Sequence, residues 1–288
     1  MSERAAEMDV GRGIAYFEAT SSGNDEYNFS VIRGETREPD ILLRHARSRA
    51  DFSPGSRRLL LHGERLAVFD TESGALNDVG GAAGLARDRT SFTWDPAGEQ
   101  LLLGGPIGET VRVGIFSYRV ATRETIQLGA VRASELGLMR WSREGSYVYG
   151  ELKGPDRFVR FPVNPEHWTT DPITREEFLK ADLVWPEDIY DGSTTVPDPD
   201  GWKAVCNDSH TLRLIRGEET RLLVRKPWWK GLGDFGAARQ GPYRPFWLRE
   251  FKAIGYSYRG RIEIVDRASG RELFQRAGEL PICIGCPH

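Results

Sequence analysis

The C-terminal end of the sequence carries the most compact group of residues that could bind a metal, Cys283-Ile284-Gly285-Cys286-Pro287-His288. Two thiolates separated by two residues can bind Zn²⁺, and His288 could supply a third ligand. A structural zinc normally takes four ligands, and the sequence contains no second Cys-x-x-Cys pair. Cys283, Cys286 and His288 are therefore our candidate metal ligands. A redox role, a disulfide-like loop and a purely structural role for the two cysteines stay open as alternatives.

The spacing of this tail disfavours two covalent modifications. Attachment of a c-type haem requires a histidine directly after the second cysteine, where this chain has Pro287. Prenylation requires a cysteine four residues from the end, where this chain has Gly285. We predict no bound cofactor.

A second candidate site lies between residues 226 and 247, where aromatic and basic residues gather. This stretch contains three Trp, one Tyr, two Phe and several Arg or Lys residues. Aromatic residues and arginine are enriched in protein interfaces and at their energetic hot spots. The alternative is aromatic packing between sheets. The predicted partner-binding residues are Trp228, Trp229, Arg239, Tyr243, Arg244 and Trp247.

The remaining residues that could do chemistry do not form a recognisable catalytic set. His45, His62, His167 and His210 are far apart in the sequence, and there is no Gly-x-Ser-x-Gly nucleophile motif or glycine-rich phosphate loop. Residues 198–201, Asp-Pro-Asp-Gly, resemble part of a calcium loop, but such a loop needs a longer series of oxygen ligands and a closing Glu. We predict a polar turn here and no catalytic residues.

The bulk composition argues against several classes of protein. The net charge is −3, from 39 basic and 42 acidic residues, whereas strong non-specific nucleic-acid binding needs clustered Lys and Arg. No apolar run reaches the roughly 18 residues of a membrane span, and the N-terminus lacks the apolar core of a signal peptide. Three cysteines do not provide a disulfide framework. We expect a cytoplasmic protein with no nucleic-acid partner and no membrane span.

A sequence pattern that recurs along the chain, called here the repeated phrase, predicts the strands and turns that must position these residues. An aromatic residue or Pro precedes a polar turn with Pro, Asp, Ser or Gly, and an apolar run follows; the phrase is clearest at 52–58, 94–100, 141–147 and 197–203. The six apolar runs begin at Ile14, Leu59, Leu101, Val148, Ala204 and Ala253, with successive gaps of 45, 42, 47, 56 and 49 residues. Each phrase predicts a β-hairpin, because Pro and Gly set the turn dihedrals and Asp or Ser accepts backbone hydrogen bonds. The spacing is typical of four-stranded propeller blades.

Two of the units continue with a strand that ends in Asp and a Ser-Gly turn, at 65–74 and 261–270. With the phrase described above, this pattern resembles the blades of TolB-type and WD40-type β-propellers over most of the chain. The Gly-His and Trp-Asp pairs of WD40 blades are missing, so the TolB-type pattern fits better. The resemblance implies an all-β fold, a six-bladed β-propeller formed by residues 1–288 as one domain. Blades arranged in a ring cover both faces of each sheet and leave only short edges.

Two segments depart from the repeat. The β-prone tail at 280–284 has no unit of its own, and we expect it to supply an inner strand to the first blade, whose own first strand is missing from the sequence. The longest gap contains helix-forming residues, which predict a short helix from about Thr174 to Leu183 between the fourth and fifth blades, with Phe178, Leu179 and Leu183 packed on the ring. This insertion is either a decorated loop or a partner-binding lid.

The function predicted from these features is a non-catalytic scaffold that binds a protein partner or belongs to a larger assembly. Its support is the aromatic segment on a rigid frame together with the lack of a recognisable catalytic set. The alternative is a propeller hydrolase or lactonase, in which carboxylates or a metal would converge at the central channel.

Overall fold

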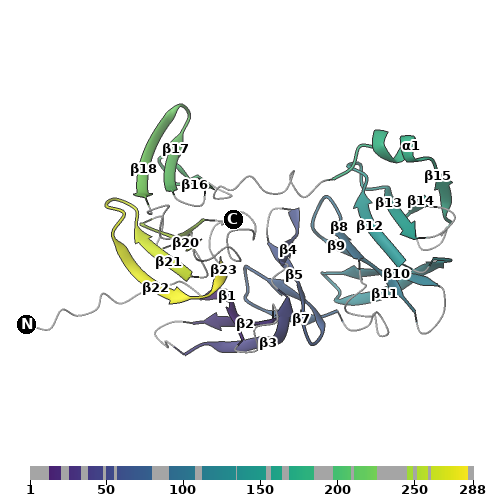
Figure 1. Ribbon diagram of the computed structural model, residues 1–288, viewed down its shortest axis with the longest axis horizontal. Helices are drawn as coiled ribbons and strands as arrows, with labels where there is room; N and C mark the ends of the chain where they lie inside the picture. Colours follow the sequence, from purple (N-terminus) through teal and green to yellow (C-terminus); the bar gives the residue numbers. More distant parts are fainter. Residues whose placement is uncertain are drawn as a thin grey trace, which may run out of the picture. The chain divides into compact units, whose positions relative to one another are not determined.

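The computed structural model describes residues 13–20, 26–33, 38–47, 50–54, 57–79, 91–107, 112–133, 135–153, 157–163, 169–184, 197–208, 211–225, 245–248, 252–258 and 261–284. These residues form β-strands and a short helix (Figure 1). The described part contains no helix that is both long enough and apolar enough to cross a membrane. The chain divides into two compact units, one formed by Met1–Arg49, Asp70–Leu76 and Tyr190–His288, the other by Ala50–Phe69 and Asn77–Ile189.

The strands form six small antiparallel sheets, as the repeat predicts. The sheets with orders β4-β5-β6-β7, β8-β9-β10-β11 and β12-β13-β14-β15 follow one another in the chain. Their strands are β4 (Ala50–Phe52), β5 (Arg58–His62), β6 (Leu66–Asp70), β7 (Leu76–Asp78), β8 (Ser91–Trp94), β9 (Gln100–Pro106), β10 (Val113–Arg119), β11 (Glu124–Val131), β12 (Glu135–Trp141), β13 (Tyr147–Lys153), β14 (Phe158–Pro162) and β15 (Asp171–Ile173).

The other three sheets have the orders β16-β17-β18, β19-β20-β21-β22 and β23-β1-β2-β3. Their strands are β16 (Lys203–Asp208), β17 (Thr211–Arg216), β18 (Glu219–Arg225), β19 (Phe246–Leu248), β20 (Ala253–Tyr258), β21 (Arg261–Asp266), β22 (Glu272–Ala277), β23 (Glu279–Cys283), β1 (Ile14–Ala19), β2 (Glu26–Ile32) and β3 (Asp40–Arg47).

Within each unit, sheets that follow one another in the chain share hydrophobic cores. Sheets β4–β7 and β8–β11 meet around Leu60, Val68 and Leu103, while β8–β11 and β12–β15 meet around Ile115 and Trp141. In the other unit, one core joins β16–β18 to β19–β22, and two smaller cores join β19–β22 to β1 and β2. A small sheet cannot hide both of its faces alone, so this stacking is what keeps the apolar runs away from water.

The predicted apolar runs occupy equivalent places in their sheets. Five of the six lie in the second strand of a four-stranded sheet: β1, β5, β9, β13 and β20. The sixth begins at Ala204 in β16, the first strand described for its sheet, and the residues before it at 185–196 lie outside the described part. The hairpin repeat is therefore confirmed as the building principle of the chain.

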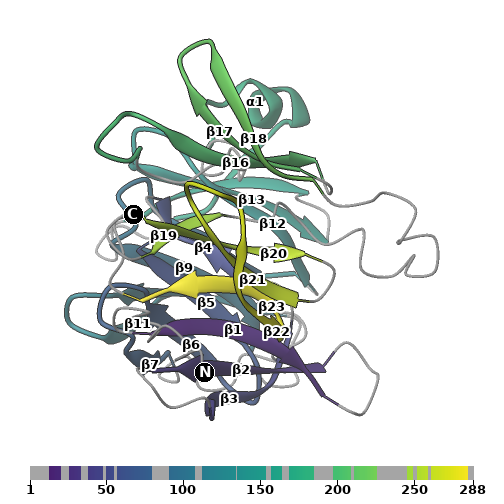
Figure 2. The same cartoon turned by 90° about the vertical axis from the view of Figure 1, so that its left-hand side faces the viewer.

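The C-terminal strand completes the sheet that the N-terminal strand begins. β23 pairs antiparallel with β1, with Cys283 opposite Ile14 and Ile282 opposite Ala15 (Figure 2). It takes the edge position, next to the second strand, that β4, β8, β12 and β19 take in their own sheets. The strand predicted for residues 280–284 is thus confirmed, and Ile284 extends the pairing by donating its backbone N–H to the carbonyl of Gly13 at 2.9 Å.

The polar turns between first and second strands share one hydrogen-bond pattern. The Asp95 carboxylate accepts a bond from the Gln100 N–H at 2.8 Å, and the Asp95 N–H donates to the Gln100 carbonyl at 2.9 Å. The Ser142 hydroxyl accepts from the Tyr147 N–H at 3.1 Å, and the Ser142 N–H donates to the Tyr147 carbonyl at 2.9 Å. A single side-chain oxygen thus stabilises the turn, which explains why Ser and Asp exchange freely in the repeated phrase.

The Ser-Gly turns after the third strands are also alike. Asp70 Oδ1 accepts bonds from the backbone N–H and the hydroxyl of Ser73, at 2.6 and 2.7 Å. Asp266 Oδ1 does the same with Ser269, at 2.7 and 2.6 Å. The bonds from Ser269 hold the pKa of Asp266 below its usual range, because they stabilise the charged carboxylate.

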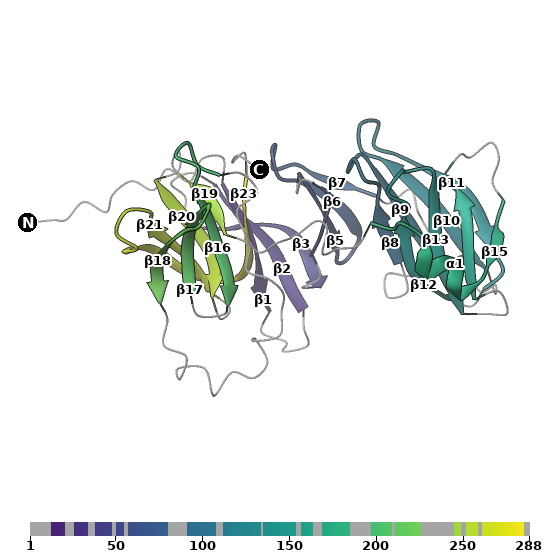
Figure 3. The same ribbon diagram turned by 90° about the horizontal axis from the view of Figure 1, so that it is seen from above.

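The predicted helical insertion contains a short helix, α1 (Arg175–Lys180). Thr174 caps it, because its hydroxyl accepts from the Glu177 N–H at 3.1 Å while the Glu177 carboxylate accepts from the Thr174 N–H at 2.7 Å. Phe178 packs on the face of its own sheet, with its ring centroid 5.0 Å from that of Phe158. Figure 3 shows α1 beside the strands β12 and β13 of this sheet. This face is opposite the one that carries the core around Trp141.

Two details of the helix prediction are wrong. The helix ends at Lys180 rather than near Leu183, because the Ala181 backbone is extended. Leu183 still packs beside Phe178, but Leu179 is 63% exposed and points away from the sheet. A six-residue helix buries only a narrow stripe, so the neighbour of a buried Phe is turned toward solvent.

Candidate functional site

Most of the site residues predicted from the sequence fall outside the described part. Trp228, Trp229, Arg239, Tyr243 and Arg244 belong to this group, as do Cys286 and His288. The partner-binding and metal-binding predictions for these seven residues therefore stay predictions.

Two predicted site residues are placed by the structure. Cys283 lies in β23, opposite Ile14 of β1. Trp247 lies in β19 and is 1% exposed, within the core that joins β16–β18 to β19–β22. Its position favours the packing alternative for this residue, since a buried indole offers no surface to a partner.

The predicted aromatic segment starts directly after β18 ends at Arg225, and its last two residues, Phe246 and Trp247, lie in β19. The helix-containing segment leads into β16, the first described strand of the same sheet. In the sequence, both departures from the repeat therefore border sheet β16–β18, while α1 itself packs on sheet β12–β15. The contacts that hold this sheet against β19–β22 define the frame of the candidate site.

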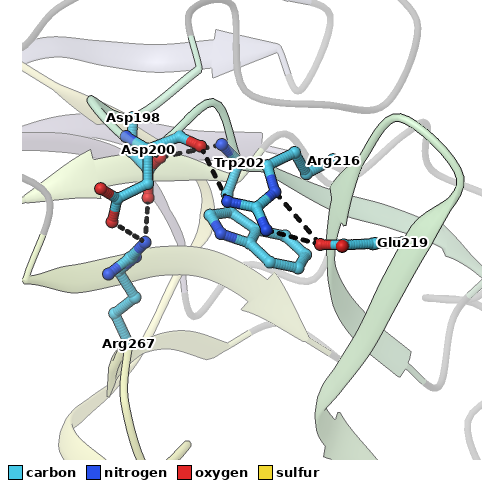
Figure 4. A network of polar contacts seen from close by, with 6 residues as sticks. All are labelled: Asp198, Asp200, Trp202, Arg216, Glu219 and Arg267. Carbon is cyan, nitrogen blue, oxygen red and sulfur yellow. Dashed lines mark hydrogen bonds and ion pairs between the residues drawn. The ribbon is translucent and has the colours of Figure 1, made fainter.

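Asp198 is the centre of a polar network at one end of these two sheets (Figure 4). Its side chain is only 1% exposed, and Oδ1 accepts bonds from the backbone N–H groups of Asp200 at 2.9 Å and Trp202 at 2.8 Å. The Asp198 N–H donates to the Trp202 carbonyl at 2.8 Å, and Gly201 takes φ +82° to close the turn. This is the turn pattern of the repeat, one residue shorter than at Asp95.

Arg267 links this turn to the neighbouring sheet. It follows Asp266 in the turn between β21 and β22, and its Nη2 forms ion pairs with Asp198 Oδ2 and with Asp200 Oδ2, the latter at 3.1 Å (Figure 4). Breaking a buried ion pair from one side leaves an uncompensated charge, so this contact is costly to lose. The two sheets are therefore joined by charge at their end as well as by the apolar core.

Arg216 extends the network to the β17–β18 turn. Its guanidinium carbon lies 4.7 Å from the centroid of the Trp202 indole, and its Nε and Nη2 donate to Glu219 Oε2 at 3.1 and 2.7 Å. The Arg216 Nη1 also donates to the Asp200 carbonyl at 3.4 Å (Figure 4). Cation–π stacking and a two-pronged carboxylate contact fix this side chain in one orientation.

A second polar group lies inside the same pair of sheets. Glu263 of β21 is 1% exposed, and it accepts bonds from the Tyr256 hydroxyl at 2.5 Å and from Gln275 Nε2 at 3.3 Å. These three residues stand opposite one another on β20, β21 and β22. Burial raises the pKa of Tyr256 far above its usual value, and the bond to Glu263 raises it further, so the phenol stays a neutral donor.

These contacts support a structural role for the network. A guanidinium stands beside the two carboxylates where a Ca²⁺ ion would have to bind, so the contacts favour the polar-turn interpretation of residues 198–201. Within the residues that the structure describes, no group of three or more His, Cys, Asp or Glu side chains is placed to hold a metal ion.

Neither Arg267 nor the Glu263 group could be predicted from the sequence. Arg267 follows the Asp of a Ser-Gly turn, but the equivalent position in the other such turn is Thr71. Glu263 sits between Ile262 and Ile264 and looks like an ordinary exposed residue of an alternating strand. Its burial follows from the sheet that packs on its face, which local pattern does not reveal.

Comparison with protein-family models and with curated sequences finds no match. Comparison with solved structures does. TolB from Acinetobacter baumannii is 13% identical, with a TM-score of 0.40 over 95% of this chain and 67% of that chain. The β-propeller domain of Cps50 (Swd1) from Myceliophteria thermophila is 11% identical, with a TM-score of 0.33 over 91% of this chain and 79% of that chain.

A further match is the dihydro-heme d1 dehydrogenase NirN, 14% identical with a TM-score of 0.39 over 98% of this chain and 57% of that chain. The chain resembles TolB-like and WD40-like β-propellers. Similarities of this strength carry no information about function, and the neighbours differ from one another in what their names describe.

Proposed function

We propose that the chain is a non-catalytic, protein-binding module built as a six-bladed β-propeller in a single domain. The observation that carries the proposal is the position of the two departures from the repeat in the chain, where one precedes β16 and the other follows β18. That sheet is held to β19–β22 by a shared core and by the Asp198–Arg267 ion pair. Binding residues are commonly carried by irregular segments on rigid scaffolds.

The aromatic segment between β18 and β19 is the proposed binding element, with Trp228, Trp229, Arg239, Tyr243 and Arg244 as contact residues. Its two ends are fixed by described residues on either side. Leu223 and Val224 of β18 pack against the shared core, and Phe246 to Leu248 of β19 are buried. A partner in the cytoplasm and a role as a subunit of a larger assembly are part of the same proposal.

The experiment that tests this proposal is affinity capture with the tagged chain. We expect a partner to be recovered in a defined stoichiometry, and the double variant Trp228→Ala/Trp229→Ala to lose it. Leu179→Ala serves as the matched control, because it removes an exposed apolar side chain from the other departure from the repeat. A partner retained by the double variant would refute the placement of the interface, and the absence of any partner would refute the binding function.

The hydrolase or lactonase alternative predicts carboxylates or a metal that converge from several sheets. This alternative stays a prediction.

A further inference from the structure

Strand β23 links two sheets of the same compact unit. It pairs with β1 in the sheet β23-β1-β2-β3, whereas in the chain it follows β22, the last strand of the neighbouring sheet. β22 ends at Ala277 and β23 begins at Glu279, so Gly278 alone connects the two strands. A single residue therefore carries the chain from one sheet into the next.

No turn of the chain ties β23 to the strand with which it pairs. In the sheet β8–β11, the strand at the same edge position is β8, and the polar turn at Asp95 joins it to its neighbour β9. Exchange of β8 would require this hairpin to be taken apart. β23 can leave β1 by rotation about the backbone of Gly278, because that residue is its connection to the preceding strand.

The contacts that hold β23 are made by its own residues and by Ile284 directly after it. Ile282 stands opposite Ala15, and Ile282 and Ile284 are 5% and 1% exposed. The Ile284 N–H donates to the Gly13 carbonyl at 2.9 Å, and a Cβ on Gly74 would come within 3.0 Å of Ile284 Cγ2. The site beside β1 therefore fits this segment closely, and an identical segment from a second copy would make the same contacts.

Gly278 forms a tight, buried hinge. Its φ is +148°, a backbone conformation that residues with a side chain rarely adopt. A Cβ at this position would come 2.6 Å from Cδ2 of Tyr16 and 3.2 Å from the carbonyl oxygen of Phe17. The closed chain therefore requires glycine here. Short hinges under such constraint favour exchange of the element that follows, because opening the hinge releases the constraint.

The pairing next to this hinge is irregular. Glu279 stands opposite Phe17 and Ile282 stands opposite Ala15, so three steps along β23 match two steps along β1. The strand thus carries one extra residue in its first half, as in a β-bulge. The regular pairing is at Ile282 and Cys283, farther from the hinge. The part of β23 that must reorganise during exchange is therefore the part that is less regularly paired with β1.

We propose that β23 exchanges between two copies of the chain, so that the β23 of each copy pairs with β1 of the other. The product is a symmetric dimer with two identical strand pairings. The change of backbone conformation is confined to Gly278, and the contacts of Ile282 and Ile284 are kept. This self-association goes beyond the protein-binding function proposed above and does not depend on it.

The first test changes the hinge and measures the dissociation constant of the dimer by size-exclusion chromatography with light scattering over a range of concentrations. We expect the wild-type chain to dimerise as its concentration rises. Gly278→Ala places a Cβ against Tyr16 in the closed chain but not in the opened one. Its dissociation constant should be at least about tenfold lower than that of the wild type, since each dimer relieves two hinges.

The matched control for the hinge variant is Gly270→Ala. Gly270 also has a positive φ, +69°, and an added Cβ would meet the backbone carbonyl of Leu223. It lies in the turn between β21 and β22, where no exchanged strand begins. The variant should therefore lose stability without any change in the dissociation constant of the dimer.

The second test identifies the exchanged strand and leaves the hinge unchanged. Cys283 stands opposite Ile14, and opposite residues of antiparallel strands are close enough for a disulfide. Copies with Ile14→Cys/Cys283→Ser are refolded together with wild-type copies and then oxidised. In this mixture, a disulfide between the introduced thiol and Cys283 must join two copies. We expect this covalent dimer, with the disulfide located by mass spectrometry.

Three results would overturn the proposal. The first is that the wild-type chain and Gly278→Ala both stay monomeric at every concentration. The second is that Gly270→Ala strengthens the dimer as much as Gly278→Ala does. The third is a dimer that forms no disulfide between the introduced thiol and Cys283. If Gly278→Ala does not fold, the cross-linking result decides the question, because it uses the natural hinge.

Discussion

Replacement of Asp198 gives the sharpest test of the frame described above. In Asp198→Ala, the backbone N–H groups of Asp200 and Trp202 lose their shared acceptor, and Arg267 loses its buried partner. Removal of one partner from a buried ion pair typically costs about 3–5 kcal/mol, and the remaining pair with Asp200 offsets part of this. We expect the free energy of unfolding to fall by about 2–4 kcal/mol.

The neighbouring carboxylate provides the control for this variant. Asp200 contributes one 3.1 Å ion pair to Arg267 from a side chain that is 66% exposed, so Asp200→Ala should cost about 0–1 kcal/mol. Asp198→Asn keeps an acceptor oxygen for the two N–H groups but loses the charge. Its free energy of unfolding should therefore lie between those of the two alanine variants. Urea unfolding followed by circular dichroism measures all three differences.

A double-mutant cycle separates the ion pair from the turn. If Asp198 acts through Arg267 as well as through the backbone, Asp198→Ala and Arg267→Ala should show a coupling energy of at least about 1 kcal/mol. A cost of Asp198→Ala no greater than that of Asp200→Ala would refute the structural importance of the buried carboxylate. Additive effects in the cycle would refute the link between the two sheets.

Three further predictions concern local features. Phe178→Ala should lower the free energy of unfolding by about 3 kcal/mol, because it removes the ring that packs between α1 and β14. Leu179→Ala removes an exposed side chain and should lower the free energy of unfolding by less than about 0.5 kcal/mol. Urea unfolding distinguishes the two variants. Gly217→Ala should lower the free energy of unfolding by about 1 kcal/mol, because alanine is strained at this positive φ. The added Cβ meets no atom within 4 Å, so no steric clash contributes. Equal stability of the two proteins in thermal unfolding would disprove this. The pKa of Asp266 is lower in the folded than in the unfolded chain, so its stabilisation is complete above the unfolded value near 3.8 and is lost as the pH falls through the folded value. Asp266→Asn should therefore be less stable than the wild type at about pH 6, and unfolding measured across pH should show this difference shrinking as the pH is lowered below the unfolded value.

The repeat could be predicted from the sequence because the residues that form it act locally. A turn such as that at Ser142 needs only one acceptor side chain and one flexible position, here Gly145 with φ +80°. These requirements are met within six residues, so they leave a visible pattern. The strand at 279–283 could also be predicted, because a β-prone run without a unit of its own has to find an edge to pair with.

The frame of the candidate site could not be predicted, because its contacts join residues far apart in the chain. Arg267 and Asp198 are 69 positions apart (267 − 198), and no residue near either one in the sequence indicates that the two side chains form an ion pair. Glu263 is buried only because β16 and β17 pack over its face, with Tyr256 as its donor. The aromatic composition of residues 226–247 led to the prediction that Trp247 lies in an interface. Trp247 is instead buried in the core because it belongs to β19, a strand of only three residues that is too short to leave a visible pattern in the sequence.

The alternation of β16 and β17 shows where functional information survives in a degenerate repeat. Repeated hairpins need apolar side chains on every face that another sheet covers, so Leu59 to Leu61 and Leu101 to Leu103 carry no more than the packing requirement. Lys203 and Arg213 depart from that apolar pattern in the paired strands β16 and β17, where Lys203 stands opposite Ile215 and Arg213 stands opposite Val205. The departure from the repeat, rather than the repeat itself, is therefore the place to look for what this protein binds.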